Sequence, residues 1–260
     1  TYQIHISQGE IANTLNDQAL KLRPYYEQLK ERVRGEPIVH LDETGWKLFI
    51  DQDKNFAWIM SGSESKESVF LIGENRGGGN VQTLIGNNYD GVVVTDDYGA
   101  YKKLKKHQLC WAHLLCKFRD LARSGELSET QHAHCKNEYQ KICMIYDDVK
   151  NDRRIERYEE FAKRLHDISS ISPDDPRQLV RTKTTLRKNI ENYLVCLSDP
   201  KIPMTNNQAE RSLRHLVLKR KISFGSLTKR TAENLAVLLS ALMSLKQRHQ
   251  ANFFLEYLKV

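Results

Sequence analysis

The stretch Gly91-Val92-Val93-Val94-Thr95 is a continuous run of apolar and β-branched residues. Such a run is typical of a strand buried on both faces, because a strand with one solvated face would alternate apolar and polar residues. We therefore expect a central parallel strand here. Three strand-like runs separated by polar turns precede it and predict a three-stranded meander over residues 37–50, 55–60 and 68–72.

The segments between and after these runs complete an α/β pattern. Residues 76–84 begin with three glycines after an arginine and predict a short helix, whereas a phosphate-binding loop there is the weaker alternative. Residues 101–106 predict a further helix, and residues 107–111 predict a fifth short strand. The resulting order β-β-β-α-β-α-β is that of the ribonuclease-H-like fold. We expect an α/β fold with a ribonuclease-H-like mixed sheet and flanking helices.

Helical patterns occupy the start, the middle and the end of the chain. Ser7-Gln8-Gly9-Glu10 matches a capping box, and it starts a helix that Pro24 is expected to break or restart. From about Ala112 to Leu197 the period is helical and the charge density is high, which predicts an all-helical insertion. Later helices are expected from about Asn207 and over 231–249. The expected organisation is a helical segment at 1–35, a ribonuclease-H-like core at 36–111 and 201–260, and the insertion at 112–200.

The composition is that of an ordinary globular chain with a basic balance. Its 260 residues are 40% hydrophobic, which is enough for one sizeable core. The net charge of +7 favours a polyanionic partner, because Lys and Arg supply most nonspecific affinity for DNA. The sequence has no long apolar run and no signal-like start, and it has five cysteines, so we expect reduced thiols in a cytoplasm and no membrane span. Because it starts at Thr1 rather than Met, we expect a segment of a longer polypeptide.

Three carboxylates stand at the ends of the expected elements: Asp42, Asp96 and Glu210. Mg²⁺ takes oxygen ligands, and two such ions can stabilise both oxygens of a phosphodiester displacement. The spacing alone leaves alternatives open, since the chain has 33 acidic residues. Asp96 could cap the next turn, and Glu210 could close a capping box with Asn207. Asp42 is harder to explain structurally, because a charged residue within a central strand needs a partner or a metal.

Basic residues flank two of these acids. They are Lys102, Lys103, Lys105 and Lys106 after the second acid, and Arg211, Arg214, Lys219, Arg220 and Lys221 after the third. Arg211 and Arg214 are one helical turn apart, and Arg suits bidentate contact with phosphate. We therefore expect this set to bind the DNA backbone, with a solvated helix face as the alternative.

The cysteine and histidine residues suggest a competing zinc site. The candidates are Cys110, His113, Cys116, His132, His134 and Cys135. Structural zinc usually shows two matched ligand pairs, whereas the pairs here are mixed, so zinc is the weaker interpretation. His113 is also a candidate accessory residue, expected at a strand end near the acids, where it would touch phosphate or water; a packed, hydrogen-bonded His is the alternative.

Several blocks of the sequence resemble, in order, those of the insertion sequence 66 family of transposases. They are His40 to Thr44, Thr95 to Tyr101, Cys110 to His113, Asn206 to Arg214 and Arg220 to Ser226, with Ile6 to Gly9 at the start. These blocks extend over nearly the whole chain. Together they are specific for the family, whereas any single block is not. The resemblance implies a DDE catalytic domain in which Asp42, Asp96 and Glu210 bind Mg²⁺, or Mn²⁺ as a substitute, with a helical insertion between the second and third acids.

The resemblance also implies partners and a reaction. The partner is double-stranded DNA, at transposon ends and target, in a bacterial cytoplasm at the nucleoid; a homodimer is left open. The reaction is metal-dependent cleavage and strand transfer. A nuclease or junction resolvase of the same fold and an inactive DNA-binding relic remain as alternatives.

The pair Asp96 and Asp97 needs a separate choice, because adjacent strand residues point to opposite faces. Alternation does not decide between them. In the resembling family the metal-binding Asp stands two residues before the first Tyr and five before the second, which selects Asp96. Asp97 is then expected to form a turn and cap the helix expected from Tyr101.

Overall fold

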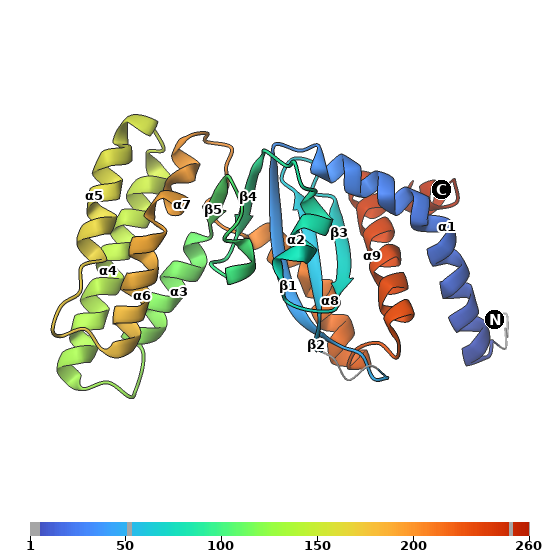
Figure 1. Ribbon diagram of the computed structural model, residues 1–260, viewed down its shortest axis with the longest axis horizontal. Coiled ribbons are helices and arrows are strands. Elements are labelled where there is room, and N and C mark those ends of the chain that lie inside the picture. Colours follow the sequence, from blue (N-terminus) through green and yellow to red (C-terminus); the bar gives the residue numbers. More distant parts are fainter. Residues whose placement is uncertain (1–5, 51–53, 250–251, 260) are drawn as a thin grey trace. The chain divides into compact units, whose positions relative to one another are not determined.

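The computed structural model describes residues 6–50, 54–249 and 252–259. Its contacts divide the chain into two compact units, which comprise residues 1–91, 99–103 and 207–260 in the first and residues 92–98 and 104–206 in the second. Figure 1 shows the helices and strands of both.

The first unit contains an antiparallel meander covered by helices. Its elements are α1 (Gln8–Arg34), β1 (Ile38–Lys47), β2 (Lys54–Gly62), β3 (Ser68–Gly73), α2 (Gly78–Ile85), the short 3₁₀ helix η1 (Gly99–Tyr101), α8 (Asn207–Ser223), α9 (Lys229–His249) and α10 (Phe253–Tyr257). β2 pairs with both β1 and β3 in antiparallel register. The expected meander is confirmed.

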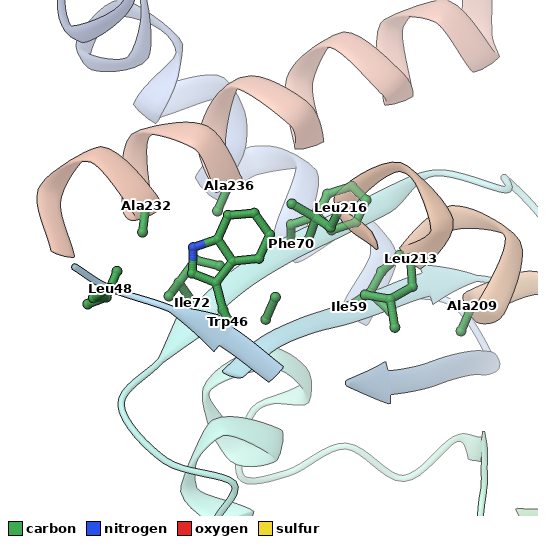
Figure 2. Packing of buried hydrophobic residues seen from close by; sticks show 11 residues of the cluster. Trp46, Leu48, Ile59, Phe70, Ile72, Ala209, Leu213, Leu216, Ala232 and Ala236 are labelled. Atoms are coloured by element: carbon green, nitrogen blue, oxygen red, sulfur yellow. The ribbon is translucent and has the colours of Figure 1, made fainter. Parts of the chain in front are cut away.

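Apolar side chains on one face of the meander pack against α8 and α9. Figure 2 shows the buried cluster, to which the strands and the residue after β1 contribute Trp46, Leu48, Ala57, Ile59, Phe70 and Ile72 and the helices contribute Ala209, Leu213, Leu216, Ala232 and Ala236. The strand members alternate along the sequence, as period 2 requires, and the α8 members follow a spacing of three or four. Burying these side chains removes apolar area from water, and this contact is what fixes α8 on the sheet.

Polar side chains of neighbouring helices satisfy the outer edge of β3. The Phe70 amide donates to Ser240 Oγ at 2.8 Å, and the Ser68 amide donates to Ser244 Oγ at 3.2 Å. Tyr26 of α1 donates its hydroxyl proton to the Phe70 carbonyl at 2.8 Å. An unpaired strand edge is a template for aggregation, so these hydroxyls close it without another strand.

The second unit contains two parallel strands and a helical bundle. Its elements are β4 (Val92–Thr95), β5 (His107–Leu109), α3 (Trp111–Ala122), α4 (Glu129–Asn151), η2 (Ile155–Arg157), α5 (Tyr158–Ile168), α6 (Arg177–Lys188), α7 (Ile190–Leu194) and η3 (Val195–Leu197). β4 pairs with β5 in parallel. The helices α3 to α6 run side by side in Figure 1, and each contacts its neighbours in the bundle. The expected helical character of this segment is confirmed.

A buried ionic network joins three segments of that bundle. Lys183 of α6 has its Nζ atom 2.8 Å from Glu138 Oε2 of α4 and 3.0 Å from Asp175 Oδ1 in the α5–α6 loop. His134 Nε2 lies 2.8 Å from the same Asp175 oxygen, and the Ser172 amide donates to Asp175 Oδ2. The neighbouring cations help to lower the pKa values of Glu138 and Asp175 although burial opposes this. A buried charge without a partner is costly, so this network constrains how α6 is rotated.

The strand order is β3-β2-β1-β4-β5 in a five-stranded mixed sheet, and the α/β class predicted from the sequence is confirmed. Val92 to Thr95 of the apolar run form a strand, and helices begin near Asn207 and Thr231 as expected. The Ser7 capping box is confirmed in both directions, since the Glu10 amide donates to Ser7 Oγ and the Ser7 amide donates to Glu10 Oε2. No helix in the described part of the chain is long and apolar enough to cross a membrane.

Two expectations about local structure are wrong. The helix expected over 101–106 is replaced by η1, which ends at Tyr101. The run of lysines that follows offers no apolar face to pack, and Tyr101 itself is fully buried. Pro24 does not end the first helix, because α1 continues through it from Gln8 to Arg34, and Figure 1 shows the helix bending along its length. Apolar contacts on both sides of Pro24, by Leu22 and Tyr26, offset the lost hydrogen bond.

We predict that His107 makes the protein less stable in mild acid. His107 is buried on β5 with its Nε2 atom 2.6 Å from Thr95 Oγ1, and burial lowers its pKa to about 4 from 6.5. The unfolded chain takes up a proton near pH 6.5 whereas the folded chain does not until about pH 4, so acid favours unfolding across this window. The loss reaches about 3 kcal/mol near pH 4.

Chemical denaturation at several pH values measures this effect. His107→Gln keeps a hydrogen-bonding side chain but cannot titrate, so its free energy of unfolding should depend less steeply on pH between 6.5 and 4. Equal pH dependence in the two proteins would show that His107 is not responsible.

Candidate active site

Asp42 lies on the face of the meander against which α8 packs. It is paired across the strands with Ile59, a member of the buried cluster that includes Leu213 and Leu216 of α8. Directly opposed residues share a face, so the Asp42 side chain lies on the α8 side of the sheet. It is partly buried, and its Oδ1 accepts a hydrogen bond of 2.8 Å from the Glu43 amide. That bond holds one carboxylate oxygen in a fixed direction.

Glu43, the next residue, points to the opposite face and is neutralised there. It is paired with Trp58, and its Oε1 accepts from Arg76 Nε at 2.9 Å and also from Arg76 Nη2. Tyr101 donates its hydroxyl proton to Glu43 Oε2. The Glu43 side chain is 1% exposed. Sequence reasoning missed this network, because nothing in the spacing connects Glu43 with Arg76 and Tyr101.

Glu210 lies near the start of α8, which is fixed to the end of β2. Gln208 donates from Nε2 to Ser61 Oγ at 2.9 Å and to the Gly62 carbonyl, and its Oε1 accepts from Lys66 Nζ at 2.9 Å. Glu210 is partly buried between the buried positions Ala209 and Leu213. Since α8 begins at Asn207, Glu210 is its fourth residue and lies in the first turn of the helix.

The second unit contains Asp96 and Asp97, directly after β4. Asp96 Oδ1 accepts a hydrogen bond of 3.0 Å from the Tyr98 amide, so Asp96 shapes the turn. Asp97 was expected to cap a helix, but its Oδ2 atom forms an ion pair with Lys117 of α3 instead. The expected helix cap is therefore wrong, whereas the expected place of Asp97 in a turn is confirmed, since the chain bends at Asp97 between β4 and η1.

His113 and the remaining zinc candidates have defined surroundings in the second unit. His113 lies in the first turn of α3 rather than at a strand end, which corrects the expectation. His134 is paired with Asp175. Burial raises the pKa of the Cys135 thiol, which makes it harder to ionise and a poorer metal ligand. His132 is exposed, and Cys116 is partly buried.

Residues 1–234 of the chain match the sequence model of the Transposase IS66 family. The chain belongs to this family. The resemblance inferred from the sequence is thereby confirmed, and the match includes all three candidate acids. Membership gives the protein a role in DNA transposition and makes it a DNA-processing enzyme, with DNA as a partner and a divalent metal implied. The curated proteins include no match to the chain.

The candidate DNA-binding residues of this transposase are exposed. Arg211, Arg214, Lys219 and Lys221 project from α8, and Lys102 and Lys103 follow η1. In the described parts of the chain, none of these six forms an ion pair. Arg220 differs, since it is partly buried and its Nη1 donates to Thr44 Oγ1 at 3.0 Å and to the Gly45 carbonyl. Arg220 therefore also holds α8 to β1.

The block Arg220 to Ser226, which carries part of the family resemblance, joins the end of α8 to β1. Gly225 has a φ of 142°, and a Cβ atom there would lie 2.2 Å from the Lys47 carbonyl oxygen. Only glycine fits this approach. Ser226 follows with its amide 2.9 Å from the same carbonyl, and its Oγ accepts from Trp46 Nε1 at 3.2 Å. These contacts position the far end of the helix that carries Glu210.

We predict that the two neighbouring acids of β1 differ in their effect on stability. Glu43→Gln removes the charge that Arg76 and Tyr101 contact in a buried setting, and it should lower the free energy of unfolding by about 2 kcal/mol. Asp42→Asn keeps an oxygen acceptor for the Glu43 amide at a partly buried position, and it should cost less than about 1 kcal/mol. Urea denaturation of both variants measures the difference. Equal losses would contradict the assignment of Glu43 as the structural acid.

Proposed function

We propose that the chain is a DDE catalytic domain that cleaves DNA and transfers strands during transposition. The proposal assigns metal binding to Asp42, Asp96 and Glu210. The observation that carries it is that Asp42 is placed on the face that α8 covers, while the adjacent acid, Glu43, is committed to a buried network. The family match over the segments that contain all three acids supports the same assignment.

The chemistry of these donors suits a hard divalent cation. All three residues offer carboxylate oxygens, which Mg²⁺ and Mn²⁺ prefer, whereas the cysteine and histidine set is mixed and partly engaged elsewhere. The Glu43 amide donates a hydrogen bond to Asp42, and the Tyr98 amide donates one to Asp96. Each bond orients one carboxylate oxygen before an ion binds. When bound, such an ion lowers the pKa of a water ligand and offsets charge that develops on phosphate oxygens. We propose Mg²⁺, with Mn²⁺ as a substitute.

The reaction we propose has two displacements at phosphorus. Water first attacks the phosphodiester at a transposon end, the P–O3′ bond breaks, and the 3′-hydroxyl leaves. That hydroxyl then attacks a phosphodiester of target DNA, and a new P–O3′ bond forms as another 3′-oxygen departs. Arg211 and Arg214, exposed on the turn after Glu210, would hold backbone phosphates near the acids of this chain. No covalent enzyme intermediate is needed.

The fold and cellular setting belong to the same proposal. The order of β1, β2, β3, α2, β4 and β5, followed later by α8, supports a ribonuclease-H-like core over 36–111 and 201–260 with the helical insertion 112–200 between the second and third acids. We propose that it acts on double-stranded DNA, at the nucleoid of a bacterial cytoplasm. Strand-transfer products would distinguish a transposase from a nuclease or junction resolvase with the same acids. The absence of any DNA cleavage by the chain would indicate an inactive DNA-binding relic.

We predict that Mg²⁺ or Mn²⁺ raises the melting temperature and that Glu210→Gln removes the increase. Carboxylates brought together repel until a cation binds, and a ligand that binds only the folded state stabilises it. Glu233→Gln is the matched control, since Glu233 lies at the fifth position of α9 in the same unit. The shift should survive in the control. If it also survives in Glu210→Gln, Glu210 is not a ligand.

We predict that Asp96→Asn abolishes DNA cleavage with the fold intact, while Asp97→Asn retains cleavage. Asp96 is the proposed ligand, whereas Asp97 is paired with Lys117, so its loss should cost stability of at most about 1 kcal/mol. Plasmid nicking with Mn²⁺ measures cleavage, and circular dichroism checks the fold. An active Asp96→Asn protein would overturn the assignment.

A further inference from the structure

The helix α6 of the insertion carries a stripe of cations on the side opposite its buried face. Its buried residues are Leu179, Lys183 and Leu186. At about 100° per residue, Arg177, Arg181 and Lys188 lie within roughly 40° of one another and point away from that face. All three are exposed, as is Arg187 at the side of the stripe. The helix contains no acidic residue from Arg177 to Lys188.

The outward direction of this stripe is enforced by the buried network. Lys183 is 2% exposed and is held by Glu138 and Asp175. Rotating α6 about its axis would separate that ammonium group from both carboxylates, at a large desolvation cost. The one cation of α6 that has acidic partners therefore fixes the four others toward solvent.

The other helices of the bundle carry both acids and cations, and several of their cations form ion pairs. Arg164 of α5 forms ion pairs with Asp148 and Glu160. Arg157, just before α5, forms ion pairs with Asp152 and Glu160. In α4, Lys141 pairs with Glu138. Within the described residues, Arg177, Arg181, Arg187 and Lys188 form no ion pair. A row of exposed, unpaired cations repels itself, so it lowers stability unless a polyanion is bound.

We propose that α6 is a second DNA-binding surface, which holds the phosphate backbone of a duplex separately from the basic residues of α8. The inference rests on the proposed function in taking DNA as the partner. At 1.5 Å per residue, Arg177, Arg181 and Lys188 are spaced by about 6 and 10 Å along the helix. Such spacing lets the three cations contact several phosphates along a backbone, and Arg adds bidentate contacts.

The chemistry of the stripe favours a nucleic-acid backbone over a membrane surface. A helix that lies on lipid needs a broad apolar face beside its cations, whereas in α6 Leu179 and Leu186 are buried inside the bundle and Val180 is partly buried. The hydroxyls of Thr182, Thr184 and Thr185 donate to carbonyls of their own helix. Contact through charge alone implies binding to DNA of any sequence, with a strong dependence on salt.

The test compares DNA affinity against salt concentration for the full chain and matched variants. The variant Arg177→Gln, Arg181→Gln, Lys188→Gln removes the stripe. The control Lys136→Gln, Lys150→Gln, Lys163→Gln removes the same charge from exposed positions of α4 and α5. A third variant, Arg177→Lys with Arg181→Lys, keeps the charge, and Arg211→Ala with Arg214→Ala tests the α8 surface.

Loss of the stripe should reduce the slope of log K against log salt by about 2 to 3 and weaken binding at least about tenfold near 0.1 M salt. The control should change the slope by less than about 1, the lysine variant should keep it, and the α8 variant should lose about 2 on its own. Melting curves confirm that each variant is folded.

Two outcomes separate the failure of this inference from the failure of the proposed function. If the stripe variant and its control have equal slopes while the unmodified chain cleaves DNA, α6 does not bind DNA and the proposed function stands. If the unmodified chain never cleaves DNA but the stripe variant loses salt-dependent binding that its matched control keeps, the inference stands and the catalytic proposal falls. Absence of DNA binding by the unmodified chain at low salt overturns the inference.

Discussion

The candidate site depends on the alternation of side chains along β1. Adjacent strand residues point to opposite faces, so Asp42 and Glu43 cannot share an environment. On one face Asp42 lies among residues that α8 covers, and on the other Glu43 is buried with Arg76 and Tyr101. A shift of register by one residue would exchange these positions and expose the apolar set. The hydrophobic pattern that keeps Trp46 and Leu48 on the α8 side therefore also chooses which acid is available for chemistry.

The position of Glu210 follows from contacts at both ends of α8. Near the start, Gln208 bonds to the end of β2, and near the finish, Arg220 and the Gly225–Ser226 turn bond to β1. Between them, Leu213 and Leu216 pack on the sheet. Hydrogen bonds set the location and apolar burial supplies the driving force, because neither alone fixes both the rotation and the axial position of a helix. A carboxylate one turn inside such a helix is held more firmly than one on a loop.

Much of this arrangement could be predicted from local patterns, and each miss has a physical cause. The apolar run before Asp96, the alternating meander and the Ser7 capping box were all predictable, since each depends on residues within a few positions. The helix expected after Tyr101 was wrong because the lysines that follow have no apolar face to pack, and the helix cap assigned to Asp97 was wrong because Asp97 pairs with Lys117 of another helix. The break expected at Pro24 was wrong because Leu22 and Tyr26 are buried on both sides of it. Asp97 forms an ion pair with Lys117, and the Tyr101 hydroxyl donates a hydrogen bond to Glu43. Of the three candidate acids, the family motif selected Asp96, and the sequence pattern alone did not.

The distribution of paired and unpaired cations links the fold to the proposed DNA contacts. Cations that the fold needs are buried or paired: Arg76 with Glu43 in the first unit, and Lys183 with Glu138 and Asp175 in the second. Exchanging such a pair for apolar residues is often neutral, so these pairs are better explained by the orientation they impose than by net stability. The pair of Arg76 and Glu43 holds Glu43 on one face of β1, so that Asp42 is the acid on the α8 face. The contacts of Lys183 with Glu138 and Asp175 turn the cations of α6 toward solvent. The chain has a net charge of +7, and the exposed cations of α8 and α6 contribute to this excess of positive charge. A polyanionic partner is the one class of molecule that gains from all of them at once.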